Sequence, residues 1–251
     1  LKTIFGIIMD FSFLRKNMVD CQLKPNKIIN LNLIDAFLKV PREIFVNKKN
    51  INQCYLDVNI DLTKNRFLLN PMVSARLIQS LNISKDDTVL TIGSGVGYNS
   101  VILSYLCDTV IGIESIKSFY DFSVDVLTKL EVNNVVFIKS KIENGYSDQQ
   151  PYDCIFIEGG VNHIPIEILN QLSENGRLVA VEIKEGNNVL ISDVLNVYTD
   201  GDSFGYVASN SLPNFDITTG IVTESARGDN LDGFNIFTDT YSFIDFDVQN
   251  N

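Results

Sequence analysis

The chain of 251 residues is long enough for one domain with a sizeable core, and its 45% apolar and 20% charged residues are typical of a globular protein. A formal net charge of -11 argues against nucleic acid as a partner, because the phosphates would be repelled. No apolar run approaches the roughly 20 residues of a membrane-spanning helix, so no membrane partner is expected.

The four cysteines lie far apart in the sequence and form no CxxC pair. We expect all four to be reduced, which indicates a cytoplasmic protein. His163 is the only histidine and no metal-ligand spacing surrounds it, so the sequence predicts no metal site. For His163 itself a surface or capping role is favoured over that of a general base.

The sequence begins with a segment that we interpret as an N-terminal extension, residues 1–17. Its apolar start is short and is interrupted by Asp10, which is not typical of a signal peptide. Met9 is a candidate natural start, in which case residues 1–8 are an upstream extension.

Two helices are predicted before the main domain pattern begins. Apolar residues recur at helical spacing within residues 26–40, and Pro41 is a stop signal. A polar section up to Lys64 is interpreted as loop and short strand. The stretch 71–81 is predicted to be a helix with Pro71 in its first turn.

Beyond residue 86, short apolar runs alternate with helical segments. Strands are expected at 87–94, 108–115, 134–141, 152–160 and 176–183, and helices at 98–106, 119–130 and 165–172. This alternation predicts βαβ units and therefore an α/β fold with a mostly parallel central sheet.

The end of the domain departs from this alternation. Residues 187–200 and 204–212 are predicted to be two strands with no helix between them, hence an antiparallel hairpin at the sheet edge. Residues 214–251 form an acidic, aromatic-rich tail, which we expect to be removable without loss of cofactor binding. The expected main domain is therefore 18–213.

A glycine-rich loop follows the first strand of this pattern, in the stretch "VLTIGSGVGYNS". Gly93, Gly95 and Gly97 leave the backbone N–H groups accessible, because a Cβ would block close approach of a ligand. The spacing is G-x-G-x-G, and Tyr98 stands where the dinucleotide fingerprint has its last glycine, which argues against NAD.

Glu114 ends the second strand, 21 residues beyond Gly93, where an acidic side chain can accept both hydroxyl groups of a ribose. The loop and the acid together predict an adenosine-type ligand at the carboxyl ends of the strands. The simpler alternative is a tight strand–helix turn with a surface glutamate.

Several stretches in order resemble the protein-L-isoaspartate O-methyltransferases: "MVDCQL", "VPREIFV", "YLDVNI", "VLTIGSGVGYNSVILSYL", "VIGIE", "PYDCIFIEGGVNHIP" and "QLSENGRLVA". The match runs from about Met18 to about Phe215. It is most similar to a divergent bacterial branch of the family that lacks the Thr-Ile-Ser acceptor motif. The resemblance implies a Rossmann-like class I methyltransferase fold, with an N-terminal helical segment, that uses S-adenosylmethionine (SAM).

The resemblance also implies the roles of individual residues. The glycine loop would surround the methionine and ribose parts of SAM, and Glu114 would hold the ribose hydroxyls. The implied substrate is the L-isoaspartyl carboxylate of a damaged protein or peptide, whose methyl ester collapses to a succinimide and hydrolyses partly to aspartate. The cofactor contacts expected are Gly93, Ser94, Gly95, Gly97, Glu114, Ile142 and Glu158.

Two departures concern the cofactor side. The acid common in the family two positions before the first loop glycine is Thr91 here. The motif after the third strand, usually Gly-Asp-Gly, is Ser140-Lys141-Ile142, so that a lysine replaces the acid expected at the adenine amine.

A third departure concerns the acceptor side. Where active members have Thr-Ile-Ser, a polar residue and proline, this chain has Phe67-Leu68-Leu69-Asn70-Pro71. The acceptor position is therefore assigned to Leu69, Asn70 and Pro71, with the substrate-positioning serine missing. Ser74 is a less favoured substitute for that serine.

The missing serine weakens the predicted activity without removing its chemical basis. A carboxylate is already ionised at neutral pH and needs no general base. Loss of one orienting donor costs about 1–3 kcal/mol, or roughly 10- to 100-fold in rate. Two alternatives stay open: a SAM-binding protein without catalysis, and a methyltransferase with a different, less polar acceptor.

Three further side chains have competing interpretations. Arg42 is expected to tie the N-terminal helix to the core, in preference to binding a substrate carboxylate. Asp153 is either a ligand contact or a structural carboxylate satisfied by backbone N–H groups. Glu158, at the end of the fourth strand, is a candidate contact for ligand or substrate.

Overall fold

The structure is a computed structural model that describes residues 2–4, 7–64, 66–161, 163–186, 189–199 and 204–208, with side chains described between residues 10 and 181. The acidic tail predicted at 214–251 lies outside the described residues. Within them, no helix is long and apolar enough to cross a membrane.

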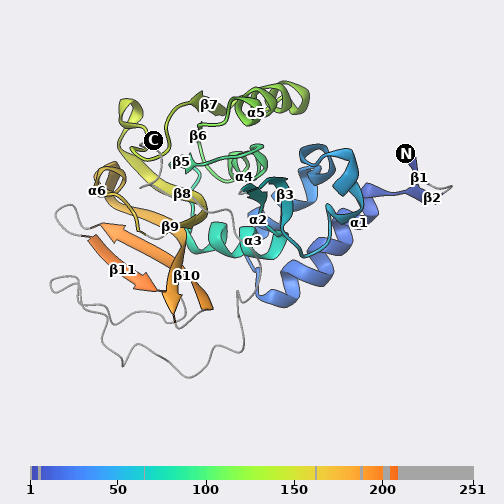
Figure 1. Cartoon of the computed structure of the whole chain (residues 1–251), viewed down its shortest axis with the longest axis horizontal. Coiled ribbons are helices and arrows are strands. Elements are labelled where there is room, and N and C mark those ends of the chain that lie inside the picture. The colour runs from blue at the N-terminus through green and yellow to red at the C-terminus, as the bar shows by residue number, and fades with distance from the viewer. Residues whose placement is uncertain are drawn as a thin grey trace.

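A seven-stranded sheet forms the centre of the domain, in the order β11-β10-β9-β8-β5-β6-β7 (Figure 1). The strands from β7 to β9 pair in parallel, whereas β9–β10 and β10–β11 pair antiparallel. The predicted parallel sheet with a C-terminal antiparallel hairpin is thus confirmed. Its strands are β5 (Thr88–Ile92), β6 (Thr109–Glu114), β7 (Val135–Lys139), β8 (Tyr152–Val161), β9 (Leu172–Gly186), β10 (Val189–Thr199) and β11 (Phe204–Ala208).

The order of the strands reverses next to β5. The chain passes outward from β5 to β6 and β7, then returns to place β8 on the other side of β5. In open α/β sheets such a reversal leaves a crevice at the carboxyl ends of the strands, where ligands bind. The glycine loop follows β5 and therefore lies at this point of the sheet.

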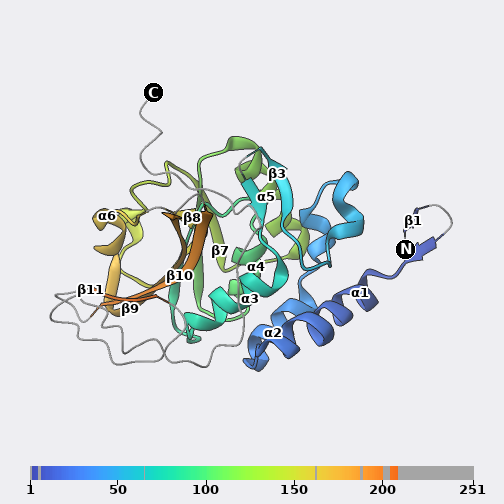
Figure 2. The same ribbon diagram turned by 60° about the horizontal axis from the view of Figure 1, so that its bottom comes forward.

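Alternation along the strands gives each face of the sheet its own apolar core. Val89 and Val110 point to one face, where they join residues of α3 (Pro71–Ser80), α4 (Tyr98–Ser104) and α5 (Lys117–Leu130). Their neighbours Leu90 and Ile111 point to the other face, where they pack with α6 (Ile166–Leu169). Figure 2 shows α6 on the opposite side of the sheet from α3 and α4.

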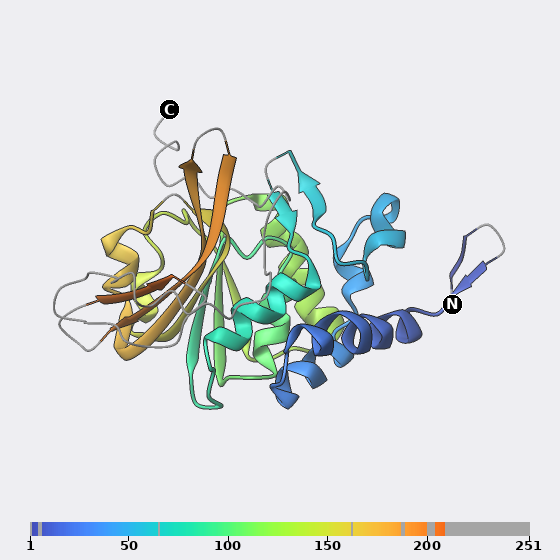
Figure 3. The same cartoon turned by 90° about the horizontal axis from the view of Figure 1, so that it is seen from below.

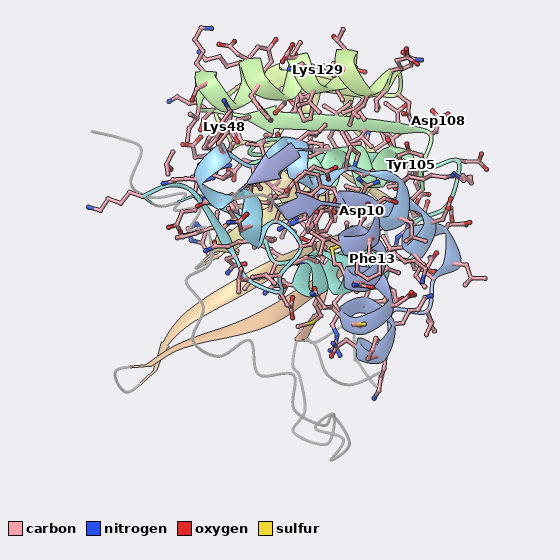
Figure 4. The ribbon with its side chains drawn as sticks, turned by 90° about the vertical axis from the view of Figure 1, so that its right-hand side faces the viewer. Asp10, Phe13, Lys48, Tyr105, Asp108 and Lys129 are labelled. Carbon is pink, nitrogen blue, oxygen red and sulfur yellow. The ribbon has the colours of Figure 1, made fainter. Side chains whose placement is uncertain are left out.

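The N-terminal segment is helical, as predicted, and lies at the far end of the molecule from the β10–β11 hairpin (Figure 3). Helix α1 runs across the expected boundary between residues 17 and 18, and Asp10 caps it by accepting from the backbone N–H of Ser12 (3.0 Å) and Phe13 (3.1 Å). Asp10 and Phe13 are labelled in Figure 4. The segment consists of β1 (Lys2–Ile4), β2 (Ile7–Met9), α1 (Phe11–Met18), η1 (Val19–Leu23), η2 (Lys24–Asn26), α2 (Leu31–Lys39), η3 (Arg42–Phe45) and η4 (Lys48–Gln53).

Arg42 joins this segment to the core, as expected. Its side chain is fully buried, its guanidinium lies 4.7 Å from the centre of the Tyr98 ring, and its Nη2 donates to the backbone oxygen of Leu69 (2.6 Å). Tyr98 in turn packs edge-on against Phe37 and Phe45. A guanidinium buried in this way is not accessible to a substrate carboxylate.

A small two-stranded antiparallel sheet links the N-terminal segment to α3. It consists of β3 (Ile60–Thr63) and β4 (Arg66–Leu68) and is separate from the central sheet. The short strand predicted before residue 64 is thus part of a hairpin. The chain leaves β4 directly into the expected acceptor motif.

Candidate cofactor and acceptor sites

The glycine loop has the backbone geometry that its sequence predicts. Gly93, Gly95 and Gly97 have φ angles of 70°, 55° and 83°, in the left-handed region that favours glycine. The loop is tied to β6, since the N–H groups of Gly93 and Ser94 donate to the oxygen of Ile113 (3.0 and 3.1 Å). A Cβ on Gly97 would lie only 2.6 Å from Cζ of Phe137. The loop is therefore fixed in shape by its glycines.

Glu114 lies directly against this loop and is completely buried. Its Oε2 accepts from the N–H of Gly95 (2.7 Å), and its Oε1 accepts from the N–H of Ile116 (2.9 Å). Arg66 of β4 donates from Nη2 to Oε2 (2.7 Å) and from Nη1 to Oε1 (3.2 Å). The surface glutamate of the simpler interpretation is therefore wrong, because the carboxylate faces the loop.

Glu158 lies in β8 at an irregularity in the pairing with β9, one residue beyond Ile157, which pairs with Ile92 of β5. This places it level with the start of the glycine loop. Asn99 Nδ2 donates to its Oε2 (2.9 Å), and its Oε1 has no partner among the described residues. Burial raises the pKa of Glu158 to about 8, although the bond from Asn99 and the charge of Arg66 oppose the rise.

The loop after β7 lies next to Glu114, because the N–H of Ser140 donates to the backbone oxygen of Glu114 (3.2 Å). In this loop Lys141 is exposed, whereas Ile142 is buried in the core on the α6 side of the sheet. Both carboxylate oxygens of Glu143 are buried without a hydrogen-bond partner among the described residues. Glu143 is not among the residues predicted from the sequence, although an acid two positions after Lys141 was a usable signal.

The acceptor motif has a structural role in this fold. Leu69 is 2% exposed and belongs to the apolar core. Asn70 caps α3 by accepting at Oδ1 from the N–H of Val73 (2.8 Å), and Pro71 is the first helical residue. Ser74 is fully buried within α3, with a hydroxyl that has no partner among the described residues.

Of the remaining candidates, Asp153 and Thr91 are hydrogen-bonded to neighbouring parts of the fold. Asp153 accepts at Oδ2 from the N–H of Thr88 (2.8 Å) and at Oδ1 from the hydroxyl of Ser173 (3.1 Å), which confirms a structural carboxylate. Thr91, in place of the family's acid, is buried and hydrogen-bonded to the hydroxyl of Ser100 (2.9 Å). His163 is exposed.

Metal ligands do not gather anywhere in the described part of the chain: it contains no cluster of three or more His, Cys, Asp or Glu side chains. The four cysteines are free, with Cys21 exposed and the other three buried.

The parallel sheet with its reversal beside β5, the left-handed glycine loop and the buried carboxylate at the end of β6 define a class I SAM-dependent methyltransferase. Two features of these residues fit SAM: Glu114 lies against the glycine loop at the carboxyl end of β6, and Glu158 and Glu143 have buried carboxyl oxygens without partners among the described residues.

Comparison with known proteins identifies the family. The family model "Protein-L-isoaspartate(D-aspartate) O-methyltransferase (PCMT)" matches residues 14–197, and the chain belongs to this family. It is 30% identical over 205 residues to the protein-L-isoaspartate O-methyltransferase of Desulfotalea psychrophila, covering 76% of this chain and 94% of that protein. It is 31% identical over 183 residues to that of Geobacter metallireducens, covering 73% and 85%. The chain is thus a methyltransferase enzyme, as the motifs indicate.

Solved structures show the same fold. A protein-L-isoaspartate O-methyltransferase superposes with a TM-score of 0.68 at 23% identity, covering 78% of this chain and 64% of that one. A putative enzyme of the same name from Plasmodium falciparum, in complex with S-adenosyl-L-homocysteine, superposes with a TM-score of 0.63 at 19% identity, covering 81% and 96%.

Proposed function

We propose that this enzyme transfers the methyl group of SAM to the free carboxylate of L-isoaspartyl residues in damaged proteins or peptides, as a step of protein repair. The observation that carries the proposal is the juxtaposition of the glycine loop and Glu114 with the β4–α3 segment, which holds the family's acceptor position. Arg66 of β4 contacts Glu114 of the cofactor site, and β4 continues directly into Leu69 and Asn70.

In this proposal the cofactor is held mainly from the carboxyl ends of β5, β6 and β8. The backbone of Gly93, Ser94, Gly95 and Gly97 surrounds its methionine and ribose parts, and Glu114 accepts from the ribose hydroxyls. SAM, when bound, supplies an electrophilic methyl group on a positively charged sulfur.

Three further contacts belong to the proposal. The free Oε1 of Glu158 accepts from the methionine ammonium, which compensates for the acid missing at Thr91. Glu143 accepts from the adenine amine in place of the acid that Lys141 has replaced. Ile142, buried beside this loop, provides an apolar contact for adenine.

The chemistry asks little of the protein beyond placement. An acceptor carboxylate oxygen forms a bond to the methyl carbon while the carbon–sulfur bond breaks, so that a methyl ester and a neutral thioether result and no proton moves. The catalytic task is to hold donor and acceptor about 3–3.5 Å apart and in line, away from water. The resulting ester can close to a succinimide and hydrolyse in part to a normal aspartyl residue.

The test is transfer of labelled methyl from SAM to an isoaspartyl peptide, with its aspartyl twin as control. Label on the isoaspartyl peptide alone supports the proposal and means that Leu69 is tolerated at the acceptor position. A folded protein that binds S-adenosylhomocysteine (SAH) but labels neither peptide contradicts it and favours a non-catalytic SAM-binding protein.

A second candidate is methyl transfer to a less polar acceptor. It is favoured by the burial of Leu69 and by the raised pKa of Glu158, which keeps that carboxyl largely neutral at pH 7. A neutral carboxyl near the donor can take a proton from an acceptor only after it ionises, so this activity would increase as the pH rises through about 8. Activity on isoaspartyl peptide that is constant between pH 7 and 9 argues against this candidate.

We further propose a cytoplasmic location, supported by the four free cysteines.

A further inference from the structure

Arg66 occupies the place on Glu114 that the ribose is proposed to take. Its guanidinium makes two hydrogen bonds to the carboxylate (2.7 and 3.2 Å) and a third, from Nη2, to the backbone oxygen of Gly93 (2.8 Å). The guanidinium also lies 5.7 Å from the centre of the Phe119 ring. With 8% of its surface exposed, Arg66 is enclosed in the site.

The hydrogen-bonding capacity of Glu114 is then fully used. Each carboxylate oxygen accepts one backbone N–H, from Gly95 or Ile116, and one N–H from Arg66. The two backbone donors belong to the loop and to the chain after β6, whereas the guanidinium of Arg66 is the end of a long side chain from a separate hairpin and is the donor that a ligand can displace. Ribose hydroxyls can therefore reach Glu114 only by replacing the guanidinium of Arg66.

Displacement leaves the guanidinium without its anion, which is costly away from water. Arg66 stands three residues before Leu69, on the hairpin that ends at the acceptor motif. Arg42 is fully buried and donates from Nη2 to the oxygen of Leu69, so it is not accessible to an acceptor carboxylate. An acceptor carboxylate bound in front of the motif is the anion that would pair with the released guanidinium.

We propose that Arg66 exchanges partners during the reaction cycle: it pairs with Glu114 before the cofactor binds, and with the acceptor carboxylate afterwards. This inference rests on the proposed isoaspartyl activity. In this role Arg66 replaces the missing serine as the group that positions the acceptor. Because Arg66 is released from Glu114 only when the cofactor binds, the acceptor site is complete only with the cofactor bound. A bidentate guanidinium–carboxylate contact is a stronger and more directional one than a serine hydroxyl provides.

The first experiment measures SAH binding by calorimetry in the wild type, Arg66→Gln and Arg66→Lys. SAH is chosen because its sulfur is neutral, so removal of a positive charge does not by itself favour it. The exchange predicts that Arg66→Gln binds SAH about tenfold more tightly, because the ligand no longer has to displace the guanidinium. Lys64→Gln, which removes an exposed charge from the same hairpin, is expected to leave the affinity unchanged.

The second experiment measures methyl transfer to an isoaspartyl peptide at saturating SAM. Arg66→Gln is expected to raise the KM for the peptide about 10- to 100-fold, more than it lowers kcat, and Arg66→Lys to recover part of the loss. A purely structural Arg66 would give weaker SAH binding in the glutamine variant, and that result overturns the exchange. Thermal melting verifies that each variant is folded, and Arg66→Lys serves if Arg66→Gln is not.

The outcomes separate this inference from the proposed function. If the wild type labels the peptide and the KM of Arg66→Gln equals that of the wild type, the exchange is wrong and the proposed function stands. If the wild type labels no isoaspartyl peptide, the proposed function is wrong and so is the acceptor step of the exchange, whatever the SAH affinities are.

Discussion

The proposed cofactor side and the proposed acceptor side of this molecule are built by different means. On the cofactor side the chain keeps the backbone features, three left-handed glycines and Glu114 bonded to the loop. On the acceptor side the side chains of the motif serve the fold: Leu69 fills the core and Asn70 caps α3. Backbone-defined sites tolerate changes in the surrounding side chains, whereas acceptor recognition depends on particular side chains and can change within one fold.

The largest effect is expected from Glu114→Gln. It leaves the enclosed guanidinium of Arg66 without an anion, which should lower the free energy of unfolding by about 3–5 kcal/mol. It should also weaken SAH binding about 10- to 100-fold, because the ribose loses a charged acceptor. Urea unfolding and calorimetry measure the two effects.

A matched control for this change is Asp121→Asn. It breaks the ion pair between Asp121 and Lys117 (2.6 Å) on the exposed surface of α5 and should cost less than about 1 kcal/mol. Equal losses of stability in the two variants would mean that the ion pair of Glu114 contributes no more than an ion pair on the surface.

Gly97→Ala tests whether the backbone defines the cofactor side. The new Cβ would lie 2.6 Å from the Phe137 ring, and the alanine would have to adopt a φ of 83°. The two effects together should lower the free energy of unfolding by about 2–4 kcal/mol. SAH affinity should fall with stability, since the loop cannot keep its shape. Ser94→Ala in the same loop removes only a long hydrogen bond to the oxygen of Ile113 (3.3 Å) and should leave the affinity close to that of the wild type.

The pH dependence of stability tests Glu158, which belongs to the proposed cofactor side. Its pKa is about 8 in the folded protein against an ordinary 4.5, so the unfolded chain releases the proton first. The folded protein should therefore lose stability as pH rises from about 4.5 to 8, by up to about 1.4 kcal/mol per pH unit and a few kcal/mol in all.

Glu158→Gln should remove this dependence. The variant is expected to match the wild type near pH 4 and to be more stable than it at pH 9, as measured by urea unfolding at both values. If Glu158 also pairs with the methionine ammonium, wild-type affinity for SAM should rise from pH 6 up to about pH 8, where an α-amino group begins to lose its proton, and that of the variant should not. If the stability of Glu158→Gln depends on pH as that of the wild type does, other groups cause the dependence.

The difference between the two sides also explains what the sequence predicted well. Strands, hairpin and glycine loop follow from local patterns: apolar runs, their alternation with helices, and glycine spacing. Glu114 was found because it ends a strand at a fixed distance from the loop. These signals lie within about 25 residues of each other, the scale of one βαβ unit.

Contacts between distant segments left no such signal. Arg66 and Glu114 are 48 residues apart in sequence, and nothing local marks Arg66 as the partner of a buried carboxylate. Leu69 is buried in a core built from distant segments and is bonded to Arg42, so the motif alone could not distinguish a core residue from an acceptor contact. Glu143 stands two positions after the place of the family's acid, so the motif does not mark it.

The smallest effect is expected from Asn70→Ala, and it tests the acceptor side most directly. Loss of the cap on α3 should cost about 1 kcal/mol and lower the melting temperature by about 2–4 °C. Asn70→Ser, which can also cap a helix, should recover most of this loss, and SAH affinity should stay unchanged in both. If Asn70→Ala instead raises the KM for isoaspartyl peptide without a change in melting temperature, Asn70 contacts the acceptor, and the acceptor side is then defined by side chains that the fold does not need.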